Sequence, residues 1–209
     1  MIRAVFLDAL GTLVELEPPW RHLTGLLDDP PPEPQIAAAF TAEMTYYRDH
    51  HEEGYDAESL ADLRRRCAEV LSRELGRSVD VATMMEAIRF RAYPDARPAL
   101  LELRRRGLYL HCVSNWDCSL PEVLDQLQLG EQLHGVAVSA LHGAAKPDPS
   151  IFAGPLRSAG CRPEEALHVG DTAADVDGAA AAGIAALRID RSGNGQITSL
   201  GEIVEHLQR

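Results

Sequence analysis

The stretch that decides the fold is AVFLDALGTL, residues 4–13, close to the start of a chain of 209 residues. Residues 4–7 are four apolar side chains in a row, a pattern typical of a short strand buried on both faces. Asp8 follows where the run stops, and Gly11 permits a tight turn directly after it. Burying a carboxylate is costly unless it is paired or binds a metal. Asp8 is therefore a candidate for covalent catalysis, for metal binding, or for both.

Four more apolar runs recur in the second half of the chain, at residues 108–113, 135–140, 166–169 and 184–189. Segments of helical pattern separate them. Continuous apolar strands that alternate with amphipathic helices predict an α/β fold, in which helices cover both faces of a parallel sheet. Ligands of such sheets bind beyond the carboxyl ends of the strands, which is where Asp8 stands.

Residues 15–91 have a different texture, and we expect no strand in them. After a proline-rich connector, apolar side chains recur at helical spacing over residues 36–47 and again over residues 60–75. Ser59 is the expected N-cap of the second helix, and Asp80 that of a third. The pattern predicts an all-helical insertion, residues 15–91, in a core formed by residues 1–14 and 92–209.

Composition and charge exclude several classes of protein. The formal net charge is −12, whereas a nucleic-acid-binding surface should be basic. No apolar run approaches the roughly 20 residues that span a bilayer, and the first residues lack the layout of a signal peptide. We therefore expect a cytoplasmic protein that binds a small molecule, with no nucleic-acid or membrane partner. Nothing in the sequence indicates an oligomeric state.

Two further polar motifs follow predicted strands. Ser114 and Asn115 end the run at 108–113, where a hydroxyl, an amide and the N–H groups of a helix start suit an anionic oxygen. Lys146 stands before Pro147, and a lysine in such a crevice can neutralise a phosphate or a group of carboxylates.

The last motif follows the run at 166–169. Gly170 and Asp171 come directly after it, and Asp175 and Asp177 lie in the first turn of the next predicted helix. Acids in a first helical turn complement the helix dipole, an interpretation that covers Asp175 and Asp177. It does not cover Asp171, which we interpret as a metal ligand.

The tail, residues 189–209, combines a glycine-rich loop with a closing helix. Ser199 and Glu202 stand at the spacing of a capping box. We assign this segment to packing rather than to function.

In their order and context, these motifs resemble those of the haloacid dehalogenase-like hydrolase superfamily, over essentially the full chain. The resemblance implies a Rossmann-like core with a helical cap domain inserted after the first motif. It implies that Asp8 is the nucleophile, that Lys146 and Asp175 are further catalytic residues, that Thr12, Ser114 and Asn115 bind substrate, and that Asp8, Asp171 and the backbone carbonyl of Leu10 hold Mg²⁺. Mg²⁺ would also relieve the repulsion between carboxylates that meet in one crevice.

Leu10 is the departure from this pattern. Phosphatases of the superfamily carry a second aspartate two residues after the nucleophile, which protonates the leaving alcohol and then activates water. Losing a general acid–base typically lowers the rate about 10²–10⁴-fold. We therefore expect a Mg²⁺-dependent phosphatase activity on a small phosphate ester, weakened by Leu10, unless Asp117, His50 or His51 carries the proton instead.

Two alternatives stay open. The 2-haloacid dehalogenases of the superfamily also lack the second acid and need no metal. If this chain resembles them in activity, its substrate is a 2-haloacid, Asp175 assists the attacking water, and Arg21 or Arg48 binds the substrate carboxylate. Those enzymes carry a tyrosine at the position of Leu10 and small polar residues at that of Asp171, which counts against this interpretation. The third possibility is a catalytically silent binding module, which gives no reason for clustered charge.

Overall fold

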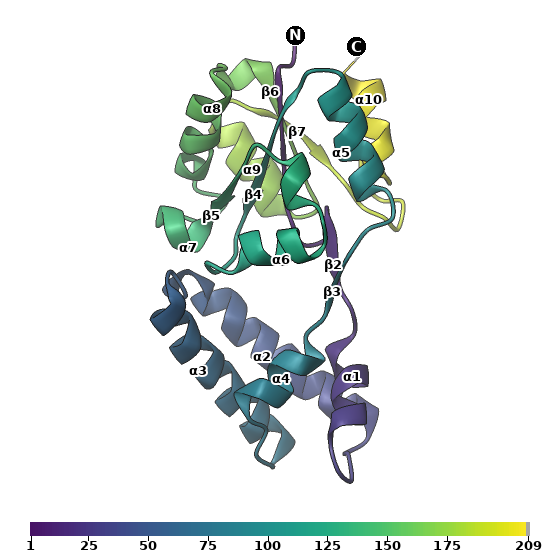
Figure 1. Cartoon of the computed structure of the whole chain (residues 1–209), viewed down its shortest axis with the longest axis vertical. Coiled ribbons are helices and arrows are strands. Elements are labelled where there is room, and N and C mark those ends of the chain that lie inside the picture. Colours follow the sequence, from purple (N-terminus) through teal and green to yellow (C-terminus); the bar gives the residue numbers. More distant parts are fainter. Residues whose placement is uncertain (208–209) are drawn as a thin grey trace. The chain divides into compact units, whose positions relative to one another are not determined.

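The computed structural model describes residues 1–207 (Figure 1). Residues 208–209 lie outside the described residues, and they are the last two residues of both the predicted core range and the predicted tail. The chain divides into two compact units, one of Met1–Glu15 with Ala92–Arg209 and the other of Leu16–Arg91. The first junction lies one residue later than the predicted boundary.

The first unit is built on a five-stranded sheet in the order β5-β4-β1-β6-β7. All four neighbouring pairs are parallel. The strands are β1 (Ala4–Leu7), β4 (Tyr109–Ser114), β5 (Gly135–Val138), β6 (Ala166–Gly170) and β7 (Ala185–Arg188). Each lies within or next to one of the five apolar runs, and the predicted α/β fold with a parallel sheet is confirmed.

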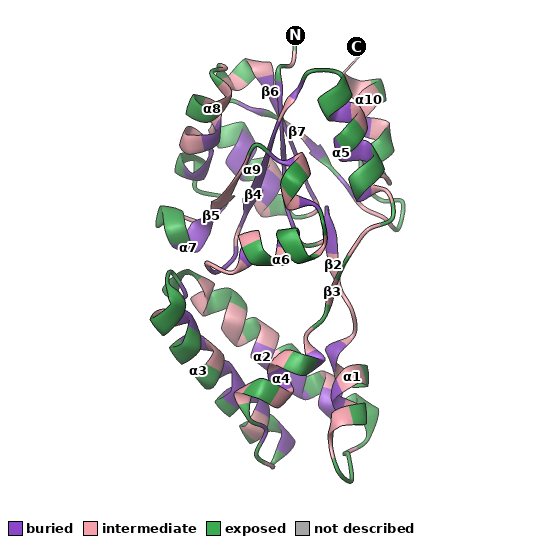
Figure 2. Ribbon diagram, viewed as in Figure 1, coloured by how far each residue is buried: buried purple, intermediate pink, exposed green. Residues whose placement is uncertain are grey.

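Helices cover both faces of this sheet. Figure 1 shows α5 (Ala96–Arg105) on one side and α8 (Ala153–Ala159) with α9 (Ala173–Ala181) on the other. The remaining helical elements of this unit are α6 (Leu120–Gln126), η2 (Gly130–Gln132), α7 (Ser139–His142), η3 (Pro149–Phe152), η4 (Pro163–Glu165), η5 (Leu200–Glu202) and α10 (Ile203–His206). Because both faces are covered, every residue of β1 is fully buried, as Figure 2 shows for the central strands. This explains why β1 is apolar throughout instead of alternating.

The second unit is helical. It contains α1 (Pro19–Leu26), α2 (Glu33–His50), η1 (His51–Glu53), α3 (Ala57–Leu75) and α4 (Val81–Ala87). The two apolar stripes fall on α2 and α3, whereas α1 was not predicted.

One predicted helix cap is correct and one is wrong. Asp80 caps α4, because its carboxylate accepts the N–H of Thr83 at 2.7 Å. Ser59 is not the N-cap of α3. That position belongs to Asp56, whose side chain accepts the Ser59 N–H at 2.8 Å while the Ser59 hydroxyl accepts the Asp56 N–H at 3.0 Å. Ser59 is thus the second member of a reciprocal capping box.

Two short strands correct the expectation that residues 15–91 hold none. β2 (Val14–Leu16) and β3 (Phe90–Ala92) pair as a separate two-stranded sheet at the two points where the chain passes between the units. Strands of three residues are too short to show an alternating pattern. No helix within residues 1–207 has the length and apolar character needed to cross a bilayer.

Candidate active site

The polar motifs meet where β1 lies between its two neighbours. Leu7, the last residue of β1, is in register with Cys112 of β4 and Val169 of β6. Asp8 therefore emerges between these two strands, and its N–H donates to the carbonyl of Val169 at 2.9 Å. After β1 the core chain continues through α5, which covers one face of the sheet, whereas β6 leads into α9, which covers the other face. Where connections from neighbouring strands run to opposite faces, a crevice opens at the strand ends.

Asp8 is almost fully buried there, with 6% of its surface exposed. Its Oδ1 accepts a hydrogen bond from Lys146 Nζ at 2.6 Å, and the Ser114 hydroxyl also bonds its carboxylate. Burial raises the pKa of the Asp8 carboxyl, and the charge of Lys146 opposes that shift. The carboxylate is thus held in one orientation.

Lys146 uses all three of its N–H donors on groups in the crevice. Besides Asp8 it contacts Asp175 Oδ1 at 2.5 Å and the carbonyl of Val113 at 2.8 Å. Burial alone would lower the pKa of Lys146, but the attraction of the two carboxylates raises it, so the ammonium stays charged.

Asn115 holds the backbone of this lysine. Its Nδ2 donates to the Lys146 carbonyl at 2.9 Å, and its Oδ1 accepts the Lys146 N–H at 2.7 Å. We predicted that Asn115 binds substrate, yet both ends of its amide are engaged by the backbone of Lys146. The peptide bond from Lys146 to Pro147 is cis.

Asp175 is buried, and both of its carboxylate oxygens are occupied. Oδ1 accepts from Lys146 and lies 3.0 Å from His168 Nε2, while Oδ2 accepts from the N–H of Thr172 at 3.0 Å and from its hydroxyl at 2.5 Å. Burial alone would raise the pKa of Asp175, but the His168 hydrogen bond and the Lys146 charge hold it well below its usual range. A carboxylate that accepts four hydrogen bonds and has a depressed pKa is a poor base. Asp175 instead holds the ammonium group of Lys146 in place through its hydrogen bond.

Two residues that supply these donors, His168 and Thr172, were missed in the sequence. Burial lowers the pKa of His168, so the ring is neutral and its Nε2–H must face the ionised Asp175. The signal was a single polar residue inside the apolar run ALHV. The signal for Thr172 was its position three residues before an acid, which is capping-box spacing.

Asp171 stands in contrast to Asp175. Burial, followed by the charges of Asp8 and Asp175, raises the pKa of Asp171 to about 6. Within residues 1–207, its Oδ1 is buried without any hydrogen-bond partner. The loop after Asp8 packs against this carboxylate at Gly11, which has φ +82°, and a Cβ there would lie 2.2 Å from Asp171 Oδ2. Only glycine fits that position.

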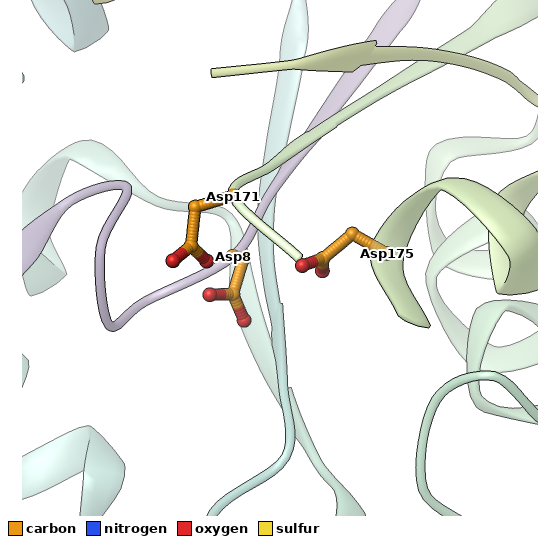
Figure 3. A group of neighbouring side chains, drawn as sticks. All are labelled: Asp8, Asp171 and Asp175. Carbon is orange, nitrogen blue, oxygen red and sulfur yellow. The ribbon is translucent and has the colours of Figure 1, made fainter. Parts of the chain in front are cut away.

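The three aspartates form an oxygen-lined group. One oxygen of each of Asp8, Asp171 and Asp175 lies within 4.8 Å of the others (Figure 3). Three carboxylates face one ammonium, and Mg²⁺ prefers such hard oxygen ligands. Asp8 and Asp171 fit a metal best, because Asp171 has an unpartnered oxygen whereas Asp175 is saturated.

The other predicted residues differ in what they offer. Thr12 is fully buried, and its hydroxyl has no partner among the described residues. Leu10 is 38% exposed, and its side chain has no group that transfers a proton. The three residues expected to carry the proton in its place make other bonds: Asp117 accepts the N–H of Ser119 at 2.8 Å, and His50 and His51 bond backbone carbonyls at the end of α2. Arg21, a candidate to bind the carboxylate of a 2-haloacid, is an exposed partner of Glu33.

Comparison with known proteins gives one family. The sequence profile of haloacid dehalogenase-like hydrolases matches residues 2–183. A phosphatase of Mycobacterium tuberculosis is 37% identical over 121 residues, which are 54% of this chain and 56% of that protein. The phosphoserine phosphatase of Thermus thermophilus is 39% identical over 120 residues, 56% of this chain and 48% of that protein. The chain thus spans about half the length of the curated relatives that it matches. L-2-haloacid dehalogenase from Xanthobacter autotrophicus shares the fold, with a TM-score of 0.74 and 23% identity over 100% of this chain and 99% of that one.

Proposed function

The chain belongs to the haloacid dehalogenase-like hydrolase family, and from that premise we propose that it is a Mg²⁺-dependent phosphatase acting on a small phosphate ester. The observation that carries this proposal is the pairing of Asp8, held by Lys146, with Asp171, whose buried Oδ1 has no partner within residues 1–207. The matched curated relatives named as phosphatases support the same class.

In the proposed reaction, a carboxylate oxygen of Asp8 attacks phosphorus, and the alcohol leaves from the opposite side. Water then hydrolyses the aspartyl-phosphate and restores Asp8. Lys146 keeps the nucleophile oriented and offsets negative charge, while Ser114 and the unpartnered hydroxyl of Thr12 are assigned to phosphoryl oxygens. Asn115 and Asp175 act through Lys146, whose backbone and Nζ they hold.

Mg²⁺ fits this arrangement. Asp8, Asp171 and the carbonyl of Leu10 would hold it, and when bound it would neutralise charge on the phosphoryl group. The helical unit, Leu16–Arg91, is the part of the chain that we assign to choosing the substrate.

Leu10 sets the expected rate. With no carboxyl at this position, the leaving alcohol and the attacking water lack their usual proton carrier. Turnover should be about 10²–10⁴-fold slower than with an acid in place. Replacing Leu10 by aspartate should recover part of that factor.

A dehalogenase activity is the weaker candidate on this geometry. It would need Asp175 to activate water, yet both oxygens of Asp175 are engaged and its pKa is held low. It would also leave the buried oxygen of Asp171 without a purpose. A silent binding module is disfavoured because it does not require the buried charges of Asp8 and Lys146.

The test is phosphate release from a panel of small phosphate monoesters, with Mg²⁺ and with a chelator. Activity should require Mg²⁺ and disappear in Asp8→Asn, whereas Asp177→Asn, the same change at an exposed position of α9, should leave it intact. Leu10→Asp should raise turnover about 10²-fold or more. Unchanged activity in chelator would overturn the proposal, and halide release from 2-chloro- or 2-bromo-acids without metal would establish the alternative.

A further inference from the structure

The tail that we assigned to packing contacts, through Arg191, the loop that begins at Asp8 and ends at Val14, which we call the nucleophile loop. This arginine follows β7 in the glycine-rich loop, 179 residues after Thr12 in the chain. Its side chain is 23% exposed, so most of the guanidinium lies inside the first unit.

Three groups hold this guanidinium. Nη1 donates to both carboxylate oxygens of Asp95, at 3.0 and 3.1 Å, and Nη2 donates to the backbone carbonyl of Thr12 at 2.8 Å. Its carbon lies 3.5 Å from the centre of the Tyr93 ring, within the range of a cation–π contact. Asp95 is fixed in turn, because its Oδ2 accepts the N–H of Leu200 at 2.8 Å. Arg191 therefore ties the tail, the start of α5 and the nucleophile loop together.

The bond to Thr12 falls on a loop with several internal backbone bonds, which also receives the Tyr93 N–H at the Leu13 carbonyl, at 3.0 Å. The N–H groups of Thr12, Leu13 and Val14 all point to the carbonyl of Ala9, at 3.2, 2.8 and 2.9 Å. At the Thr12 carbonyl this loop accepts a hydrogen bond from a charged group that lies outside it, the guanidinium of Arg191. Thr12 also carries the buried hydroxyl that has no partner within residues 1–207, so Arg191 bonds the same residue that supplies this group.

We propose that Arg191 is a positioning residue for the loop that carries Asp8 and Thr12. Its hydrogen bonds go to Asp95 and the Thr12 carbonyl rather than to the three carboxylates of the crevice, and it acts by fixing the loop that follows the nucleophile. Its catalytic consequence rests on the proposed phosphatase function, whereas its effect on the loop does not. A misplacement on the order of 1 Å at a reacting group can lower a rate about 10²-fold, so a small movement of this loop is sufficient.

The experiment compares amide hydrogen exchange in the wild type, Arg191→Met and Arg162→Met. Arg162 is the matched control, an exposed arginine of the same unit that pairs with Glu164 and Glu165 at 3.2 and 3.4 Å. In Arg191→Met, exchange at residues 12–14 should accelerate about tenfold or more, as expected for the loss of a charge-assisted hydrogen bond. The amides of β4 should keep their wild-type rates. Arg162→Met should change neither.

Kinetics give the second reading. In Arg191→Met, kcat for phosphate release should fall about tenfold to a hundredfold, while KM changes by less than about threefold. Unchanged exchange at residues 12–14 would overturn the proposal, and so would equal acceleration in β4, which marks a merely structural role. If Arg191→Met does not fold, Arg191→Lys serves, because an ammonium cannot bond Asp95 and Thr12 in the same geometry. A wild type without phosphatase activity would refute the proposed function, and exchange would still decide the role of Arg191.

Discussion

Glu43 provides a quantitative test of the helical unit. This glutamate of α2 is only 4% exposed, and it hydrogen-bonds with Cys67 of α3. Burial raises the pKa of Glu43 from an ordinary 4.5 to about 7, and the bond with Cys67 opposes part of that shift. The carboxyl is therefore protonated in the folded unit over a pH range in which it is ionised in the unfolded chain.

The sign and size of the effect follow from that difference. Between pH 4.5 and 7 the folded state binds more protons than the unfolded state, so the free energy of unfolding falls as pH rises. The stabilisation is complete below pH 4.5 and is lost as pH rises through 7. At about 1.4 kcal/mol per unit of pKa difference, the whole loss is about 3 kcal/mol.

The perturbation is Glu43→Gln, which keeps the shape of the side chain and removes its titration. The variant should match the wild type near pH 4.5 and exceed its unfolding free energy by up to about 3 kcal/mol above pH 8. Urea unfolding followed by Trp20 fluorescence measures this, in a Trp116→Phe background where Trp20 is the remaining tryptophan. Glu52→Gln, at an exposed position, is the control. Parallel pH profiles for the wild type and Glu43→Gln would refute the account.

Three further predictions concern the crevice. Gly11→Ala should destabilise the fold and weaken Mg²⁺ binding measured by calorimetry, because its Cβ would lie 2.2 Å from Asp171. Gly76→Ala, also at positive φ but in open space, should leave Mg²⁺ binding unchanged. Equal effects of the two substitutions on Mg²⁺ binding would contradict this prediction. The Mg²⁺ association constant should fall about tenfold per pH unit below pH 6, because the raised pKa of Asp171 makes protons compete there, and a flat profile from pH 5 to 8 would exclude Asp171 as a ligand. Lys146→Met should lower the unfolding free energy by about 3–5 kcal/mol at pH 8, since it leaves Asp8 and Asp175 buried without their cation. Urea unfolding should show a smaller loss at pH 5, where carboxylates protonate more easily, and a loss independent of pH would refute that reason.

Local patterns were sufficient for the scaffold. The apolar run at 4–7 is β1 without any change of bounds, because a strand covered on both faces has to be apolar throughout. Once the sheet is parallel, the residues that follow its strands must meet at one edge. For that reason Asp8, Ser114 and Asp171 could be placed together from their positions in the sequence alone.

Elements without periodicity were not predictable. Helix α1 has eight residues and β2 and β3 have three each, too few to establish a stripe or an alternation. The N-cap of α3 was placed three residues late, because both members of a capping box are polar and the pattern does not say which comes first.

Long-range hydrogen bonds were also out of reach. Lys146 and Asp8 are 138 residues apart, and the motif that contains Lys146 lies beyond α7 rather than directly at the end of β5, so the bond between them could not be located from strand ends alone. Arg191 ends no such motif, so nothing in the tail pointed to Thr12. The saturation of Asp175 depends on His168, and the sequence shows this histidine only as one polar residue in an apolar run, without indicating its partner. Pairing of this kind is decided by tertiary packing and needs the structure.

The central claim is that Asp8 attacks the substrate and becomes phosphorylated. The most direct measurement is acid quench of the protein after mixing with Mg²⁺ and a small phosphate monoester, followed by mass spectrometry of the peptide that contains residues 4–13. Because Leu10 cannot activate water, the phosphoryl group should accumulate on Asp8 in the wild type and be depleted in Leu10→Asp, which hydrolyses it faster. Phosphate release with Asp8 unmodified at every quench time, in both proteins, would contradict the claim.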